Sequence, residues 1–494
     1  MSGFAEYDRY DAVGLADLVR KREVSAAELL DEARERCDRV NSKLNAVVYR
    51  LDAEAERALH SVHRDQPFAG VPFLVKDLGP ALAGAPLTCG SRLFANYVPE
   101  EDGEIIKRFK AAGLVAFGKT NVPEFGLVPF TEPELFGACR NPWNLGWTPG
   151  GSSGGAASAV AAGIVPIAHA SDGGGSIRIP ASCCGLVGLK TSRGLNPVDP
   201  QIETIISEFV VNHVVSRSVR DSAAALDAIC HRPNEGFLSG LEAAPRPLKV
   251  AVVRSAMFGP SVAPDVRAGL DGAVRLMESL GHHLEDAEPR VDYADFGMAF
   301  LLYWAISAKQ VLDGAKEFVG HSASRQDVEL ATWTLASVGG VVPEAGRGWA
   351  KAVIESATRK FLEFSENFDV IMSPVLGSLP LRIGQNSPTA SEKIAMRIVE
   401  GLQFPWLMKA LMKTIAAKSF AFAPFTAQFN MTGQPAISVP LCWSLDGLPI
   451  GIQFAAKAGA DGLLLRLARQ LELAQAWGCR RPPVWSGEKV SEAA

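Results

Sequence analysis

Two serines in this chain are enclosed by glycines: Ser152 lies within residues 150–155, and Ser176 follows three consecutive glycines at 173–175. Glycine permits backbone conformations that other residues avoid, and it lets a second backbone or a small molecule approach closely. Successive N–H groups in such loops can converge on an anion or a developing oxyanion. The apolar, small-residue segment 156–170 between the two loops predicts a helix packed from several sides. The spacing therefore indicates two reactive loops attached to one buried element.

A serine becomes a good nucleophile only when a base removes its proton. None of the eight histidines lies beside a glycine-rich or acidic cluster, so each is better explained as a surface or structural residue. Lys76 ends the apolar run 71–75, and burial there would lower its pKa and let the neutral amine accept a proton. The alternative is a lysine that reaches the surface and pairs with Asp77. Spacing alone leaves both readings open.

Two familiar motifs fit this region less well. Ser153 lies in a G-x-S-x-G string, but that nucleophile elbow must follow a strand, and the preceding residues 141–149 contain two prolines and no strand pattern. The segment 150–155 also lacks the Gly-Lys-Ser/Thr ending of a phosphate-binding loop. Neither an elbow nor a phosphate loop is expected.

Strands and helices alternate around these loops. Residues 11–60 predict covering helices, one of them opened by a capping box at Ser25 and Glu28. Apolar runs predict further elements, namely strands at 69–76, 114–119, 248–253, 368–374, 436–440 and 450–454, and helices at 101–112, 401–419 and 461–475. The pattern is that of an α/β protein with an internal sheet, followed from about 260 to 420 by a mostly helical region.

Composition excludes several classes of function. The 494 residues carry a net charge of −5, from 49 basic and 54 acidic side chains, with no basic cluster that would indicate a nucleic-acid partner. We expect no signal peptide and no transmembrane helix. The eight scattered cysteines form no C-x-x-C pair, so we expect reduced thiols in a cytoplasmic protein rather than disulfides or a zinc site. The basic amphipathic stretch 401–419 would form a lid or core helix, with a membrane-surface helix as the alternative.

The motifs taken together resemble the amidase signature family over about residues 10–480. The matching segments are Lys76, 118–121, 150–155, 172–178, 184–190 and 433–440. This resemblance implies a single large domain over 1–485, with a central mixed twisted sheet covered by helices on both faces. It implies covering helices at 10–65, the core at 66–255, a divergent helical region at 256–425, a return to the sheet at 426–480, and a flexible tail at 486–494.

The resemblance also implies a catalytic triad. Lys76 would take a proton from Ser152, which is preceded by a cis peptide bond, and Ser152 would take one from the nucleophile Ser176. The N–H groups of Gly173, Gly174, Gly175 and Ser176 would form the oxyanion hole, and Ser153, Asp172 and Arg178 would support these loops. No cofactor and no metal are implied. Gly173 replaces the Thr or Ile usual in the family, which would loosen the loop or open space, and Thr191-Ser192 replaces the commoner Pro-Thr.

Substrate choice would depend on segments outside the triad. The apolar loop 126–130 matches a family loop beside the nucleophile, so Gly126, Leu127 and Val128, together with Trp304, are candidate pocket residues that favour uncharged amides. Tyr303, Trp333 and Trp406 are further candidates, with core packing as the alternative for each tryptophan and for Tyr303. Residues 131–146 look most like the 6-aminohexanoate cyclic dimer hydrolase branch. The rival functions are the glutaminase subunit of a tRNA-dependent amidotransferase and a non-catalytic binding protein. Beyond a small-molecule amide, a homodimer is the one partner left open.

Overall fold

The computed structural model describes residues 4, 6–232, 235–258, 262–402 and 405–487, and their strands form two sheets. The larger is an eight-stranded sheet of order β4-β6-β5-β10-β11-β9-β7-β8. Its strands are β4 (Ile167–Asp172), β5 (Val187–Lys190), β6 (Val211–Ser216), β7 (Lys249–Val252), β8 (His283–Asp286), β9 (Val370–Pro374), β10 (Ala436–Trp443) and β11 (Pro449–Ala456). Neighbours from β4 to β9 pair antiparallel, whereas β7 pairs parallel with both β9 and β8. The mixed central sheet expected from the resemblance is confirmed.

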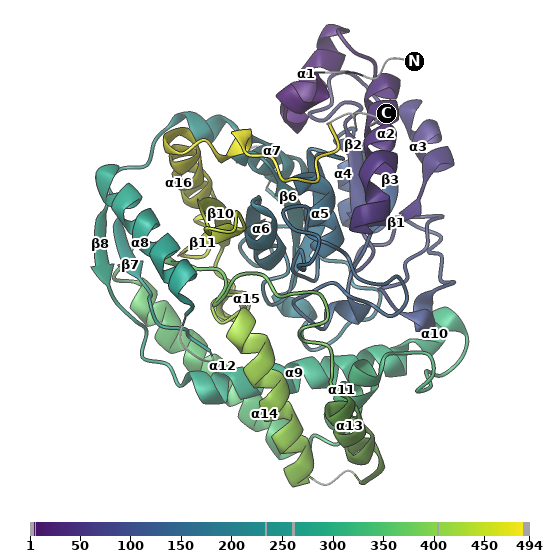
Figure 1. Cartoon of the computed structure of the whole chain (residues 1–494), viewed down its shortest axis with the longest axis vertical. Helices are drawn as coiled ribbons and strands as arrows, with labels where there is room; N and C mark the ends of the chain where they lie inside the picture. Colours follow the sequence, from purple (N-terminus) through teal and green to yellow (C-terminus); the bar gives the residue numbers. More distant parts are fainter. Residues whose placement is uncertain (1–3, 5, 233–234, 259–261, 403–404, 488–494) are drawn as a thin grey trace.

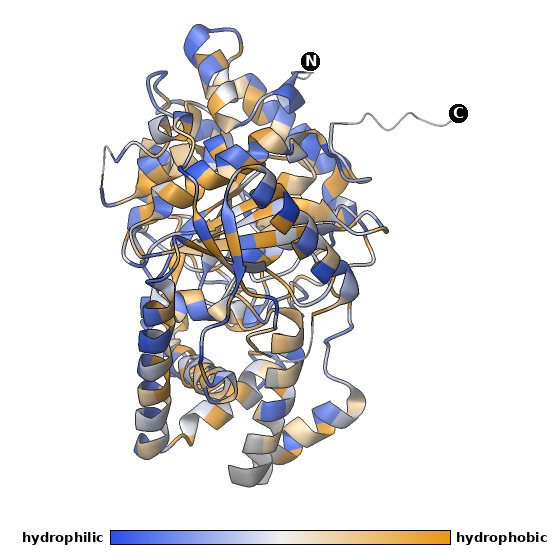
Figure 2. Cartoon of the chain, turned by 90° about the vertical axis from the view of Figure 1, so that its left-hand side faces the viewer, coloured by the Kyte–Doolittle hydropathy of each residue, from blue (hydrophilic) through white to orange (hydrophobic). Residues whose placement is uncertain are grey.

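Both faces of this sheet are covered, because its strands alternate apolar side chains between two cores. In β7, Val250 and Val252 join one hydrophobic cluster, whereas Ala251 joins the other. The first cluster is closed by α7 (Val219–Ile229), α8 (Pro264–Ser279) and α16 (Asp461–Ala474), and the second by α9 (Tyr293–Gly314), α12 (Glu344–Ser365) and α15 (Ala427–Thr432). Figure 2 shows the apolar strands enclosed by helices that are striped with polar and apolar residues.

The smaller sheet has three strands in the order β1-β3-β2, and it positions Lys76. The strands are β1 (Val47–Arg50), β2 (Pro72–Lys76) and β3 (Val115–Thr120). Strand β2 runs parallel to β3 and lies against β4 of the large sheet. The lysine strand therefore belongs to a separate small sheet rather than to the central one.

Helices α1 (Ala12–Lys21), α2 (Ala26–Leu44) and α3 (Asp52–Leu59) lie beside the small sheet, and α4 (Glu104–Ala111) precedes β3 (Figure 1). The capping box is confirmed, since the Ser25 side chain accepts from the N–H of Glu28, whose carboxylate accepts from the Ser25 N–H. The expectation of helices alone over 11–60 is wrong at β1. Two valines and a tyrosine there favour a strand, and pairing with β3 fixes it.

The segment 156–170 is only half helical, which corrects the predicted continuous helix. Helix α5 (Gly154–Ala161) ends at Gly163, whose φ of +76° is left-handed, and Pro166 then cannot continue a helix. The chain therefore enters β4 instead. The short helix α6 (Arg178–Cys184) follows β4 and packs on β5, β10 and β11.

The region from 256 to 425 is mostly helical, as expected, and forms the lower half of the molecule in Figure 1. It also holds α10 (Lys316–Val319), α11 (Leu330–Gly340), α13 (Ala390–Leu402) and α14 (Pro405–Phe422). The helix expected at 401–419 is therefore the end of α13 and most of α14. The side chains of Trp406 and Lys409 lie outside the described residues, so the choice among lid, core and membrane-surface roles stays open. Among the helices described, none is long and apolar enough to cross a membrane.

The last described residues are anchored to the body. The Ser486 N–H donates to the Ala162 carbonyl at 2.8 Å, and Arg39 Nε donates to the Ser486 carbonyl at 2.7 Å. The predicted flexible tail therefore cannot begin at 486, and its remainder at 488–494 lies outside the described residues.

Candidate active site

Lys76 is fully buried at the end of β2, where its amine faces two serine hydroxyls. Its Nζ lies 2.8 Å from Ser152 Oγ and 2.9 Å from Ser171 Oγ. The alternative of a surface lysine paired with its neighbour is wrong, because Asp77 is paired with Lys119 at 3.2 Å.

Burial lowers the pKa of Lys76 from 10.5 to about 7, because the desolvated ammonium is disfavoured. The charge of Asp172 acts in the opposite direction but does not restore the usual value. At neutral pH a substantial fraction of Lys76 is therefore an uncharged amine, which can accept a proton from Ser152.

The loop that carries Ser152 is held tightly on its other side. The peptide bond between Gly151 and Ser152 is cis, as the resemblance implied. A Cβ at Gly151 would lie 2.7 Å from the backbone nitrogen of Phe130, so no larger residue fits there. Ser153 precedes α5 and follows a bend rather than a strand, and its Oγ donates to the Ser171 carbonyl at 3.3 Å. This geometry excludes the nucleophile-elbow reading of Ser153.

The loop that carries Ser176 is shaped by a buried ion pair between Asp172 and Arg178. Arg178 Nε donates to Asp172 Oδ2 at 2.9 Å, and the N–H of Gly175 donates to Asp172 Oδ1 at 2.6 Å. Burial acts to raise the pKa of Asp172, but the charge and hydrogen bonds of Arg178 outweigh it and hold that pKa below its ordinary value. Asp172 is therefore an anion that fixes the turn.

Helix α15 supplies contacts to this loop that the sequence did not reveal. Thr426 Oγ1, just before the helix, donates to the Gly174 carbonyl at 2.6 Å. Asn430 Nδ2 donates to Asp172 Oδ1 at 2.9 Å and Arg178 donates to Asn430 Oδ1 at 2.7 Å. Ser171 was also missed, although it lies just before Asp172. Neither Thr426 nor Asn430 lies in a glycine-rich or otherwise unusual stretch, and no sequence signal linked them to residues some 250 positions earlier.

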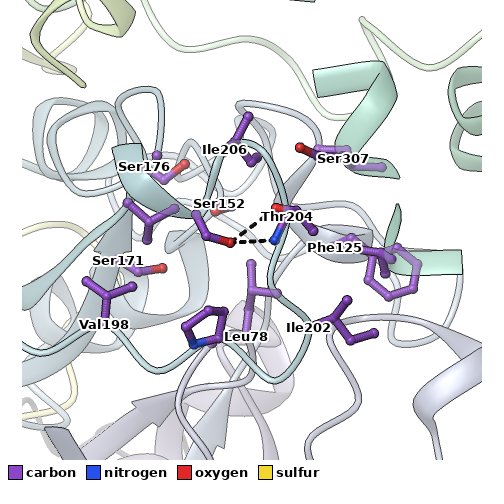
Figure 3. Close-up of a pocket in the computed structure, with 18 of the residues that line it drawn as sticks. Leu78, Phe125, Ser152, Ser171, Ser176, Val198, Ile202, Thr204, Ile206 and Ser307 are labelled. Carbon is purple, nitrogen blue, oxygen red and sulfur yellow. Dashed lines mark hydrogen bonds between the residues drawn. The ribbon is translucent and has the colours of Figure 1, made fainter. Parts of the chain in front are cut away.

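Ser152, Ser171 and Ser176 line one cavity of about 160 Å³. Figure 3 shows the three serines gathered toward one end, with Phe125, Ile202 and other side chains toward the opposite end. Ser176 is partly exposed and Ser152 is 3% exposed. In the described part of the chain, no hydrogen bond joins the hydroxyls of Ser152 and Ser176. Catalytic hydrogen bonds are often long before substrate binds, so this geometry does not separate the two residues functionally.

The four predicted pocket residues surround the serines. Gly126, Leu127 and Trp304 line the 160 Å³ cavity, and Val128 lines an adjoining hollow of about 70 Å³ that also reaches Ser176. Trp304 Nε1 donates to the Leu127 carbonyl at 3.2 Å. Tyr303 and Trp333 do not line either space; Tyr303 is buried in the second core, and Trp333 packs against it. The space left by glycine at 173 is not open, since a Cβ there would lie 3.5 Å from the Trp304 ring.

The buried histidines bond away from the serines. His169 Nε2 lies 3.2 Å from Asn212 Oδ1, and His213 Nε2 lies 3.1 Å from Ser222 Oγ. In the residues searched for clusters of three or more His, Cys, Asp or Glu side chains able to hold a metal ion, none was found. All eight cysteines are free thiols.

Comparisons with known proteins agree with this geometry. The amidase family model matches residues 28–465. The chain is 35% identical to the 6-aminohexanoate-cyclic-dimer hydrolase of Pseudomonas sp. (strain NK87), covering 98% of each protein. A solved structure of 6-aminohexanoate cyclic dimer hydrolase complexed with substrate superposes with a TM-score of 0.87 and 33% identity, covering 97% of this chain and 99% of the other. One chain of the glutamyl-tRNA(Gln) amidotransferase from Thermotoga maritima matches with a TM-score of 0.75 and 27% identity, over 97% and 98%. The chain therefore belongs to the amidase family of enzymes that hydrolyse carbon–nitrogen bonds in amides.

Proposed function

We propose that this enzyme hydrolyses small, largely uncharged amides through an acyl-enzyme on Ser176, with Ser152 and Lys76 as the proton relay. The observation that carries the proposal is the contact of 2.8 Å between the buried Lys76 amine and Ser152 Oγ, in a cavity that Ser176 shares. A serine becomes nucleophilic when a neighbouring base accepts its proton. Here the base is a desolvated amine that reaches the nucleophile through one intervening hydroxyl.

The reaction has two halves. Ser176 Oγ attacks the amide carbon while its proton passes to Ser152, and the proton of Ser152 passes to Lys76. The carbon–nitrogen bond then breaks, the leaving nitrogen takes a proton from Ser152, and Lys76 returns one to Ser152. Water attacks the acyl-enzyme with the same relay, and releases the carboxylic acid and free Ser176.

The oxyanion would be held by backbone N–H groups of the loop 173–176. The N–H of Gly175 is already committed to Asp172, so we narrow the proposed donors to Gly173, Gly174 and Ser176. Those three N–H groups have no acceptor within the described segments. Removing one oxyanion donor typically costs about 10²–10³ in rate.

Labelling with a fluorophosphonate tests the nucleophile directly. Mass spectrometry should find the adduct on Ser176, and Ser176→Ala should lower amide hydrolysis by about 10³-fold or more while the fold is retained. Ser279→Ala is the matched control, because that serine is exposed at the end of α8. An adduct on another serine, or near-full activity in Ser176→Ala, would refute the assignment and favour a non-catalytic scaffold.

A glutaminase role within an amidotransferase is the second candidate, since the chain is similar to part of a tRNA-dependent amidotransferase. Glutamine carries both an ammonium and a carboxylate, which a specific site would pair with opposite charges. Of the described residues that line the two hollows at Ser176, only Asp199 is charged, and no cation is present. Ammonia release from glutamine that exceeds hydrolysis of simple N-substituted amides would favour this alternative.

A cytoplasmic location and independence of metals and cofactors belong to the same proposal. The proposed base and electrophile stabilisers are all protein groups, so incubation with EDTA should leave the rate unchanged. An EDTA-sensitive rate that Zn²⁺ or Mg²⁺ restores would contradict this chemistry.

A further inference from the structure

Two hollows of unequal size meet at Ser176. The large hollow, of about 160 Å³, extends among Leu78, Phe125 and the segment 198–212. The small hollow, of about 70 Å³, is formed by α9, α14 and residues 126–129. Residues that line both are Gly126, Leu127, Ser176 and Trp304. An amide bound at Ser176 can therefore extend one substituent into each space.

Trp304 forms the partition between the hollows. Its indole N–H is fixed to the Leu127 carbonyl, and its ring packs on Phe300 with centroids 5.0 Å apart. The ring edge lies over Gly173 and Gly174, where a Cβ would come within 3.5 Å and 3.8 Å of it. Glycine at 173 therefore leaves room for an indole at this position.

The two hollows differ in which serine hydroxyls they contain. Ser152 lines only the large hollow, whereas the small hollow contains Ser176 and Gly174 but not Ser152. In the proposed reaction the leaving nitrogen receives its proton from Ser152, so that nitrogen and its substituent must lie on the Ser152 side. The acyl substituent is then directed toward the small hollow.

The linings suit uncharged substituents of different lengths. The small hollow is apolar except for Ser419, and Val128, Ile179 and Phe420 close it. One face of α9 lines the large hollow with Trp304, Ser307, Ala308 and Val311, which the spacing of a helix brings together. We propose that the enzyme prefers N-substituted amides with a short acyl group and a longer apolar amine substituent, and that Trp304 enforces this polarity. The proposal rests on the proposed proton relay through Ser152.

Two isomeric amides test the assignment on the unaltered enzyme. N-hexylacetamide and N-methylheptanamide have the same formula, unbranched chains and primary alkylamine leaving groups, but the long chain lies on opposite sides of the amide. We expect kcat/KM for N-hexylacetamide to exceed that for N-methylheptanamide by tenfold or more. Equal values or the reverse preference would overturn the assignment while leaving the proposed hydrolase intact. If neither isomer reacts, the proposed amide hydrolysis itself fails, and this inference fails with it.

Matched variants at two buried alanines test each hollow separately. Ala423 lines only the small hollow, and Ala308 lines only the large one. Ala423→Leu should lower kcat/KM for N-hexylbutyramide more than for N-hexylacetamide, by about fivefold or more. Ala308→Leu should instead lower the value for N-hexylacetamide relative to N-methylacetamide. Because the isomer pair needs no substitution, poor folding of a variant does not protect the proposal, and exchanged effects would refute it.

Discussion

Lys76 combines a charged side chain with complete burial, and its titration can be observed directly. With a pKa of about 7, the amine is protonated at lower pH and cannot accept the Ser152 proton. We expect kcat/KM to fall about tenfold per pH unit below 7 and to level off above it. The same profile should govern the rate at which a fluorophosphonate labels Ser176. A rate that is flat from pH 5.5 to 8 would exclude Lys76 as the titrating base.

The same burial has a consequence for stability. The pKa of Lys76 is about 7 in the folded chain and near 10.5 in the unfolded chain, so between these values the unfolded chain holds a proton that the folded chain lacks. Stability from this group therefore rises with pH across that window and is lost as pH falls toward 7. In Lys76→Met this dependence should disappear. The free energy of unfolding of the variant, minus that of the parent, should fall by about 1.4 kcal/mol per pH unit from 7.5 to 9.5. A constant difference in denaturant unfolding would contradict the shift.

At the scale of elements, the nucleophile loop depends on α15 as well as on its own glycines. Thr426→Val keeps the shape of the side chain but removes the hydroxyl that holds the Gly174 carbonyl. Since this contact orients the proposed oxyanion N–H groups, we expect kcat to fall by about tenfold to 100-fold with a smaller change in KM. Thr426→Ser should restore most of the rate.

A purely structural role for Thr426 predicts another outcome. In that case thermal stability would fall in Thr426→Val while kcat per folded molecule stayed near the parent value. A stereochemical companion is available at Gly175, whose φ of +132° disfavours any side chain and whose Cβ would collide with Thr426 Oγ1. Gly175→Ala should therefore impair turnover as well.

The local sequence predicts elements well where one signal dominates. The capping box at Ser25 is such a case, because its two hydrogen bonds are local. The segment after Gly163 was mispredicted, since an alanine-rich run satisfies helix and buried strand equally until Pro166 is weighed. Strand β1 was missed because its four residues become a strand by pairing with β3, about 70 positions later.

The candidate site divides along the same line. Lys76, Ser152 and Ser176 lie in glycine-rich or strand-end motifs that a resemblance can carry. Thr426 and Asn430 reach the site only because β10 and β11 bring the following chain beside β5 and α6. Long-range contacts of ordinary residues leave no pattern in one sequence. The two hollows are likewise a product of packing, since they arise between segments from several distant parts of the chain.

At the scale of the whole molecule, the chain ends close the structure around the α5–β4 connection. The last segment in Figure 1 crosses the upper part of the molecule toward α2. There Trp485, 8% exposed, lies against Gly163, where a Cβ would come within 2.5 Å of its ring. Its Nε1 donates to Asp8 at 3.1 Å, and Arg481 lies 4.5 Å over the ring. One indole thus joins the N-terminal segment, the C-terminal segment and the turn between the two serine loops.

Trp485→Ala should therefore destabilise the chain far more than its distance from Ser176 suggests. Loss of a buried tryptophan typically costs about 3–5 kcal/mol, because a cavity replaces its contacts. Thermal inactivation should accelerate markedly, measured as the half-life of amidase activity at a fixed temperature, whereas kcat at 25 °C should change little. Deletion of residues 488–494 is the control, since it leaves Trp485 and Ser486 in place. If that deletion shortens the half-life as much as Trp485→Ala does, or if the substitution leaves the half-life unchanged, the indole does not fasten the two ends of the chain.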